Sequence, residues 1–263
     1  MIRITRELRC SLAGADLGEP VHNSWGGWPT GSGLGPFVRL RITVAGTVDP
    51  VTGYLCNISA IDRTARRRVI PHLCGRWSGA APAGPPCERL LSESWLMLAD
   101  HLPGTAKLVA LEIVATPYLR YATEGASAMV SVTQSFEFSA AHRLYCDQLT
   151  DAENQRLFGK CAYPSGHGHN YVVEVTVSGE PDQRSGVVMR VDELERVVKE
   201  RVIDVFDHRH LNQDIAEFAT LNPSVENITR VIWNRLDGAF APVRLACVRV
   251  YETPKTWAQY SGQ

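Results

Sequence analysis

Polar and apolar residues alternate along several segments of the chain, which is typical of β-strands that bury one face. The longest such run covers residues 130–142, where Phe136, Phe138, Ala140 and His142 fall on the same face. Similar alternation predicts strands at 2–12, 169–179 and 245–253. The pattern therefore predicts strands in both halves of the chain.

A spacing of about 3.6 residues between apolar positions predicts helices between these strands. In the second half this spacing runs from Val191 to Val202, and a second helix is expected to begin after Ser224 and to end at Gly238. Ser224 is suited to cap that helix because its hydroxyl can accept a hydrogen bond from the first turn. In the first half, the corresponding second helix is predicted around residues 92–102.

Two stretches of the chain carry the same pattern at a separation of 133 residues. Residues 40–70 align without a gap on residues 173–203, and nine of the 31 aligned pairs are identical. Several of the remaining pairs exchange one apolar residue for another. A repeat of this length indicates two tandem domains rather than an array of small repeats.

The residues that could carry chemistry differ between the two copies. Upstream of the aligned stretch, Gly33 and Gly35 of the first copy match two glycines of the second, but the histidines beside them are not shared. The second-half histidines and their first-half counterparts are His142 with Gly14, His167 with Leu34, and His169 with Pro36. The first copy is therefore expected to be degenerate and the second to be active.

Each half reads as strand, strand, helix, helix, strand, which predicts a fold of the α+β class. The length of 263 residues accommodates two domains that can each bury a core. We predict one domain over residues 1–125, which lacks metal and catalytic residues, and a catalytic domain over residues 126–263. Residues 123–127 are expected to form the linker between them.

The overall composition excludes several classes of protein. A net charge of −1 and a pI near 6.7 give no electrostatic basis for binding nucleic acid. The sequence contains no run of 18 apolar residues, so no membrane span is predicted, and the first ten residues do not resemble a signal peptide. Seven cysteines without a paired spacing are typical of reduced thiols, so we expect a cytoplasmic protein.

Three histidines of the second half are candidates for a metal site. His167 and His169 are two residues apart, so both project from one face of a strand, and His142 ends another strand. Neutral imidazoles suit zinc, and three protein ligands leave a fourth position for substrate or water. Alternatively, His167 and His169 are solvated residues of a turn. The loss of all three histidines from the first copy, beside glycines that are kept, favours the metal site.

Four other residues of the second half could take part in catalysis or binding. Cys161 could act as a base or as a fourth metal ligand, although most free cysteines are small buried hydrophobes. Asp207 beside His208 could form a proton donor and acceptor, or the histidine could cap a helix end. Glu252 could bind the guanidine-like edge of a heterocycle, or lie at a solvated strand end.

Five separated motifs in the second half resemble the 6-pyruvoyl-tetrahydropterin synthase family, which also contains 6-carboxy-tetrahydropterin synthase of queuosine biosynthesis. They lie at residues 135–144, 158–171, 207–212, 226–228 and 251–253, in the order and at the spacing of that family. The resemblance covers roughly residues 130–262. Five residues separate Cys161 from His167, which is similar to the pyruvoyl-forming branch, whereas three are more common in the carboxy-forming branch.

The resemblance implies a tunnelling fold (T-fold), so that the chain would hold two tandem units, each a four-stranded antiparallel sheet with two helices packed on one face. It implies zinc ligands His142, His167 and His169, the base Cys161, the proton relay Asp207 and His208, and substrate contacts from Glu252, Ser224 and Glu226. The family often has two consecutive threonines where this chain has Ser224 and Val225.

The function implied by the resemblance is the zinc-dependent conversion of 7,8-dihydroneopterin triphosphate to 6-pyruvoyl-tetrahydropterin with elimination of triphosphate. A 6-carboxy-tetrahydropterin synthase is the first alternative, and a zinc- and pterin-binding protein without turnover is the second. In the resembled family three units close a barrel and two barrels stack. A tandem chain is therefore expected to form a homotrimer, which would be a pseudo-hexamer with three active sites.

Overall fold

The computed structural model describes residues 1–13, 27–31, 34–78, 84–125 and 127–263. It divides into two compact units. Unit 1 comprises Met1–Val132 together with Gly179–Val188, and unit 2 comprises Thr133–Ser178 and Met189–Gln263. Unit 1 thus includes a short segment from the second half of the sequence. Gly14 and Gly33, which the sequence comparison pairs with second-half residues, lie outside the described residues.

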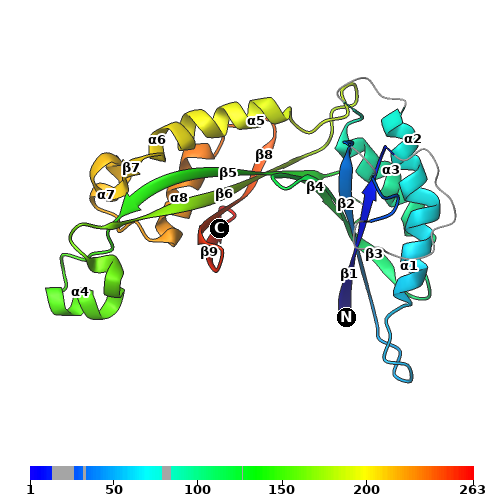
Figure 1. Ribbon diagram of the computed structural model, residues 1–263, viewed down its shortest axis with the longest axis horizontal. Helices are drawn as coiled ribbons and strands as arrows, with labels where there is room; N and C mark the ends of the chain where they lie inside the picture. The colour runs from blue at the N-terminus through cyan, green and yellow to red at the C-terminus, as the bar shows by residue number, and fades with distance from the viewer. Residues whose placement is uncertain (14–26, 32–33, 79–83, 126) are drawn as a thin grey trace. The chain divides into compact units, whose positions relative to one another are not determined.

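Unit 1 contains an antiparallel sheet in the order β1-β2-β3-β4. The strands are β1 (Ile2–Ser11), β2 (Phe37–Gly46), β3 (Lys107–Thr116) and β4 (Leu119–Glu124). Alternate residues of β1, β2 and β3, such as Leu8, Leu40 and Leu111, are fully buried. The helices gather beside these strands in Figure 1, so the buried face of the sheet and the helices enclose one core.

The helices of unit 1 form two segments. The first runs through α1 (Ile58–Thr64), a π-helical turn (Ala65–Val69) and α2 (Ile70–Ser78), and the second is α3 (Cys87–Ala99). Asn57 caps α1 by accepting a hydrogen bond from the Ser59 N–H at 2.9 Å. The helix α3 begins five residues before the predicted position.

Unit 2 contains the strand order β5-β6-β8-β9, with the short β7 paired in parallel with β5. The strands are β5 (Val130–His142), β6 (His167–Gly179), β7 (Arg209–His210), β8 (Arg244–Thr253) and β9 (Thr256–Tyr260). The strand β8 is antiparallel to both β6 and β9. In the core, the Phe138 ring of β5 stacks on the Tyr171 ring of β6 with centroids 4.9 Å apart.

The helices of unit 2 include one long interrupted segment and one capped helix. The long segment is α5 (Val191–Val198), a π-helical turn (Lys199–Ile203) and α6 (Asp204–Phe206), and Figure 1 shows it running alongside β5 and β6. The second is α8 (Val225–Leu236), which packs on β8 and β9. As predicted, Ser224 caps α8, and its hydroxyl accepts from the Asn227 N–H at 3.5 Å. The shorter elements are α4 (Asp151–Phe158), a 3₁₀ turn (Gly159–Ala162), α7 (Leu211–Asp214) and a 3₁₀ turn (Ala216–Ala219).

The predicted α+β class and the predicted strands are confirmed, but one local expectation is wrong. The expected linker at 123–127 begins inside β4, where the Thr123 side chain is buried and its hydroxyl donates to the Met129 carbonyl at 3.1 Å. Residues 119–124 form a strand because they pair with β3, and their alternation of polar and apolar residues is too short to be recognised alone. Residues 145–164, for which no element was predicted, include α4, which has a capping box formed by Thr150 and Glu153.

Irregular features of the two halves occur at matching positions. The pairing of β2 with β3 shifts register between Thr43 and Val44, and the pairing of β6 with β8 shifts between Thr176 and Val177. Both shifts lie at the same place in the alignment of residues 40–70 with residues 173–203. A hydrogen bond between two threonine hydroxyls also occurs at matching positions, between Thr5 and Thr43 and between Thr133 and Thr176, both at 2.8 Å.

Candidate metal and substrate site

The strands of unit 2 bring the three predicted histidines together. His142 is the last residue of β5, and His167 and His169 lie two residues apart at the start of β6. Each offers one ring nitrogen to a group whose members all lie within 4.8 Å of one another. The Nε2 atoms of His142 and His167 are 3.0 Å apart. The cluster could therefore hold a metal ion.

His142 is fixed in orientation by the backbone. Its side chain is completely buried, and its Nδ1 lies 2.7 Å from the Pro223 carbonyl oxygen, which can only accept a hydrogen bond. That hydrogen bond places the proton on Nδ1 and leaves the Nε2 lone pair directed at the cluster. Burial lowers the pKa of His142 to about 4, and the neighbouring histidines add to this effect. The ring is therefore neutral, as metal binding requires.

The other two histidines are also suited to accept a cation. Burial and the nearby His169 lower the pKa of His167. Among the described residues, the buried Nε2 of His169 has no hydrogen-bond partner. A buried ring nitrogen without a partner is costly in an isolated chain, and coordination to a metal would satisfy it.

Glu252 lies at the edge of the same cluster. Its Oε1 is 3.6 Å from the Nε2 of His142 and 3.8 Å from the Nε2 of His169. The structure thus places the predicted pterin-binding carboxylate beside the metal-ligand candidates, near the end of β8. A carboxylate at this distance can reach a substrate held by a metal at the histidines.

Cys161 is close enough to Glu252 to be affected by its charge. Burial raises the pKa of the Cys161 thiol, and the Glu252 carboxylate raises it further. The residue lies on the 3₁₀ turn at Gly159–Ala162, which is tied to the end of β5 because the Leu144 N–H donates to the Cys161 carbonyl at 2.8 Å. Cys161 is not a member of the metal-ligand cluster.

Asp207 and His208 form a pair next to β5. The Asp207 Oδ2 is 2.8 Å from the His208 Nδ1, and the Asp207 Oδ1 accepts from the Ser139 N–H at 2.8 Å. The hydrogen bonds from Ser139 and His208 lower the pKa of Asp207. His208 has a φ of 56°, a left-handed conformation that is uncommon for residues other than glycine, and its side chain is 82% exposed. The ring is therefore presented to solvent with one nitrogen held by a carboxylate.

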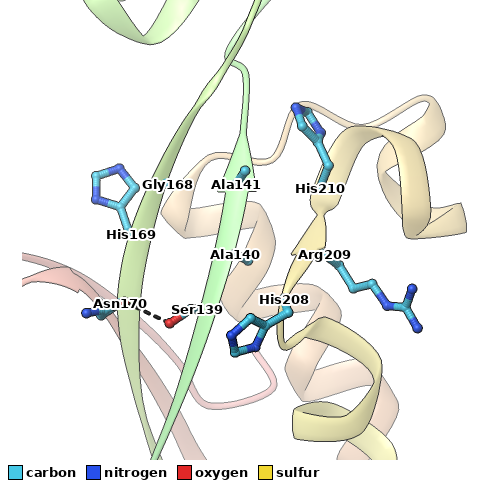
Figure 2. A pocket seen from close by; sticks show the side chains of 9 residues that line it. All are labelled: Ser139, Ala140, Ala141, Gly168, His169, Asn170, His208, Arg209 and His210. Atoms are coloured by element: carbon cyan, nitrogen blue, oxygen red, sulfur yellow. Dashed lines mark hydrogen bonds between the residues drawn. The ribbon is translucent and has the colours of Figure 1, made fainter.

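His208 and His169 line a common pocket of about 530 Å³. Figure 2 shows that His169 comes from β6, whereas His208 comes from the segment that enters β7, and that Arg209 points away from the two strands. Ser139 and Asn170 also line the pocket and are joined by a hydrogen bond of 2.8 Å. Among the described residues, His208 makes no hydrogen bond or ion pair with Cys161. One chain therefore brings the histidines and Glu252 together, and His208 faces a pocket that His169 also lines.

Ser224 and Glu226 lie at the start of α8. Pro223, whose carbonyl contacts His142, immediately precedes Ser224, so the beginning of this helix borders the histidine cluster. Glu226 is exposed and makes no hydrogen bond with any described residue.

Sequence reasoning missed three groups around the cluster. The Pro223 carbonyl orients His142, and the Asn212 side chain pairs with both backbone groups of Arg143 at 2.8 and 3.0 Å. Tyr171 is buried beside His142 and His169, with a hydroxyl that has no partner among the described residues. Tyr171 shares a strand face with His167 and His169, so the period of two could have identified it. The other two contacts join distant segments and leave no local pattern.

The sequence profile described as 6-pyruvoyl tetrahydropterin synthase matches residues 131–263. The chain belongs to this family. The matched region contains all nine predicted site residues and begins at the first residues of β5.

Individual members of the family match the same half of the chain. The Homo sapiens protein named 6-pyruvoyl tetrahydrobiopterin synthase is 40% identical over 139 residues, which cover 53% of this chain and 96% of the human protein. A Haemophilus influenzae protein named 6-carboxy-5,6,7,8-tetrahydropterin synthase is 26% identical, covering 50% of this chain and 99% of that protein. The solved structure of the Caenorhabditis elegans 6-pyruvoyl tetrahydropterin synthase is 38% identical, covers 51% of this chain and 96% of that chain, and has a TM-score of 0.49.

In the described part of the chain, no helix combines the length and the apolar character needed to cross a bilayer.

Proposed function

We propose that the second half of this chain converts 7,8-dihydroneopterin triphosphate to 6-pyruvoyl-tetrahydropterin with elimination of triphosphate. The observation that carries this proposal is the convergence of His142, His167 and His169 beside Glu252, in the region that matches the family. The spacing between Cys161 and His167 supports the pyruvoyl-forming branch.

Zinc is the metal that we assign to the three histidines. The set of three neutral nitrogen donors suits zinc, and the buried Nε2 of His169, which accepts no hydrogen bond from the described residues, is a further argument for a cation. Zinc bound there would supply a Lewis acid that polarises a hydroxyl of the substrate side chain. Pro223 would keep His142 in the tautomer that leaves Nε2 free to bind.

Proton transfer is assigned to Cys161 and to the Asp207–His208 pair. Removal of a proton from a carbon that carries a hydroxyl needs a base, and Cys161 lies beside Glu252 on the edge of the cluster. Its thiol pKa is raised in the metal-free chain, and a cation at the histidines would oppose that rise. His208, oriented by Asp207, would donate or accept the second proton. Each such group typically contributes about 10²- to 10⁴-fold to the rate.

Recognition of the pterin is assigned to Glu252, Ser224 and Glu226. The Glu252 carboxylate can accept two N–H donors from the guanidine-like edge of a pterin. Ser224 and Glu226 flank the start of α8, where the Pro223 carbonyl also contacts the metal-ligand candidate His142.

A direct assay separates this function from its alternatives. The full chain is incubated with zinc and dihydroneopterin triphosphate, with and without a reductant, and the products are identified by mass spectrometry. Release of triphosphate with a 6-pyruvoyl product supports the proposal. A 6-carboxy product assigns the chain to the other branch of the family. Tight pterin binding without turnover indicates a binding protein, although a binder would have no need of Cys161, Asp207 and His208 together.

The first half is proposed to be a degenerate T-fold unit that acts as a scaffold. The matching register shifts at Thr43 and Thr176 and the matching hydroxyl pairs support a common origin for the two halves. Three tandem chains would then form a pseudo-hexamer with three active sites. Closure of the sheets into barrels would remove exposed strand edges, which promote aggregation. Analytical ultracentrifugation tests the assembly, and a particle of six chains would contradict it.

All seven cysteines are free thiols, and we infer a reducing compartment such as the cytoplasm.

A further inference from the structure

A turn from the second half of the sequence packs on the first turn of α3 within unit 1. The turn comprises Asp182–Val188, and the Val188 N–H donates to the Glu88 carboxylate at 3.1 Å. Glu88 is only 2% exposed. Gly186 lies against Arg89, since an added Cβ would meet the Arg89 guanidinium at 3.2 Å. The contact therefore buries a carboxyl group, whose pKa is raised by that burial, against a backbone donor.

The first half of the chain carries a turn of the same construction at Asp49–Leu55. In both turns the aspartate Oδ1 accepts two backbone N–H groups and one hydroxyl, from residues two and three positions later. Gly53 and Gly186 occupy the same place, with φ of 72° and 76°. Leu55 corresponds to Val188, and both side chains are buried.

The binding site for the turn also has a counterpart, at the start of α8. Leu90, Leu91 and Leu98 of α3 are buried at the same spacing as Ile228, Thr229 and Leu236 of α8. In this alignment, which is read from the burial pattern, Glu88 corresponds to Glu226. Both glutamates lie in the first turn of their helices.

The two turns and the two helices differ in what covers them. Gly186 is buried by its contact with α3, whereas Gly53 is exposed and an added Cβ there would meet nothing within 4 Å. Val51 is 91% exposed and Tyr54 is 64% exposed. Among the described residues, the Leu55 N–H and the Glu226 carboxylate each have no hydrogen-bond partner. Within the described part of each chain, the turn Asp182–Val188 is thus packed on the start of α3, whereas the turn Asp49–Leu55 and the start of α8 each lack such a contact.

We propose that the turn Asp49–Leu55 of one chain docks on the first turn of α8 of a second copy, with the Leu55 N–H donating to Glu226. The inference rests on the assembly proposed above and assigns the contact that holds it. The exposed Val51 and Tyr54 support an occupant that is protein, because exposed apolar side chains favour association. The turn and the helix are different surfaces, so two chains joined by one such contact still present a free turn on one chain and a free α8 on the other. Such an interface grows into a closed ring or a filament.

The docked turn would also bring part of a second chain to the substrate site. Glu226 is a proposed substrate contact, and Ser224 and Pro223 connect it to His142.

Photo-crosslinking in the full-length protein tests the contact directly. Tyr54 is replaced by p-benzoylphenylalanine, and ¹⁵N-labelled chains are mixed with unlabelled chains before illumination. We expect crosslinked peptides that join one labelled and one unlabelled chain, with the attachment within residues 222–230. The same probe at Tyr118, an exposed tyrosine of unit 1, is the control and should not attach there. Attachment of the Tyr54 probe elsewhere, or only within one chain, overturns the proposal.

Variants of Glu226 provide a second measurement. Loss of a charge-assisted hydrogen bond in Glu226→Ala should raise the dissociation constant between chains about 10- to 100-fold, as measured by dilution in native mass spectrometry. Glu226→Gln keeps an acceptor and should have a smaller effect. Glu193→Ala, which removes an exposed glutamate from the first turn of α5, should have none. If the trimer is insensitive to all three variants, the proposed contact is contradicted but the proposed assembly is not. If the parent protein is monomeric, both proposals are contradicted.

Discussion

Acidification of the metal-free protein should destabilise unit 2 through His142. The pKa of the buried ring is lowered from its usual 6.5 to about 4, mainly because burial disfavours the imidazolium. Between these two values the unfolded chain binds a proton that the folded chain does not. Stability therefore falls as the pH drops from 6.5 towards 4. One pKa unit corresponds to about 1.4 kcal/mol, so the expected loss of unfolding free energy is about 3 kcal/mol.

Hydrogen-exchange mass spectrometry of β5 peptides is the suitable assay because it reports on unit 2 alone. Opening free energies of amides in residues 133–142 are measured from pH 7 to pH 4 in the presence of a chelator, with correction for the intrinsic exchange rate. His142→Leu removes the titrating group and should flatten most of the pH dependence. His101→Leu removes an exposed histidine and should leave it unchanged. Equal pH dependence in the parent and in His142→Leu would refute the reasoning.

Three further predictions concern the metal and the reaction. The purified chain should bind about one zinc, and His142→Ala should abolish this binding in a competition titration with a chromophoric chelator; binding of a second equivalent would contradict a single active copy. Cys161→Ala should keep zinc and pterin but lose most turnover, because Cys161 lies outside the metal-ligand cluster, and loss of zinc would instead identify it as a ligand. Glu252→Ala should weaken pterin binding by about 2–5 kcal/mol in calorimetry and leave zinc bound, as expected when one side of a charge-assisted pair is removed. Unchanged pterin affinity would remove Glu252 from the substrate site.

The sequence pattern predicted the parts of the fold that depend on local periodicity. Alternation located β5, β6 and β8, and the period of two placed His167 and His169 on one face. The strand β4 and the strand β9 were missed because each is short and is defined by pairing with its neighbour.

The sequence identified the side chains of the candidate site but not the backbone groups that orient them. The histidines, Cys161 and Glu252 carry recognisable chemistry, whereas the Pro223 carbonyl is a backbone group whose partner lies 81 residues away. The left-handed conformation of His208 was also not predictable, since it depends on the contacts of Asp207 and His208 with Ser139. Such features follow from tertiary contacts and leave no trace in local composition.

The π-helical turn at Lys199–Ile203 links the number of residues in a helix to the placement of the acid–base pair. A π-helical turn accommodates one residue more than an α-helical turn, and Asp207 and His208 follow directly after this segment. If the same residues formed an α-helix instead, everything downstream would turn by about 100° with a shift of about 1.5 Å. Asp207 would then no longer meet the Ser139 N–H. The orientation of the proton relay is therefore encoded by chain length as well as by residue identity.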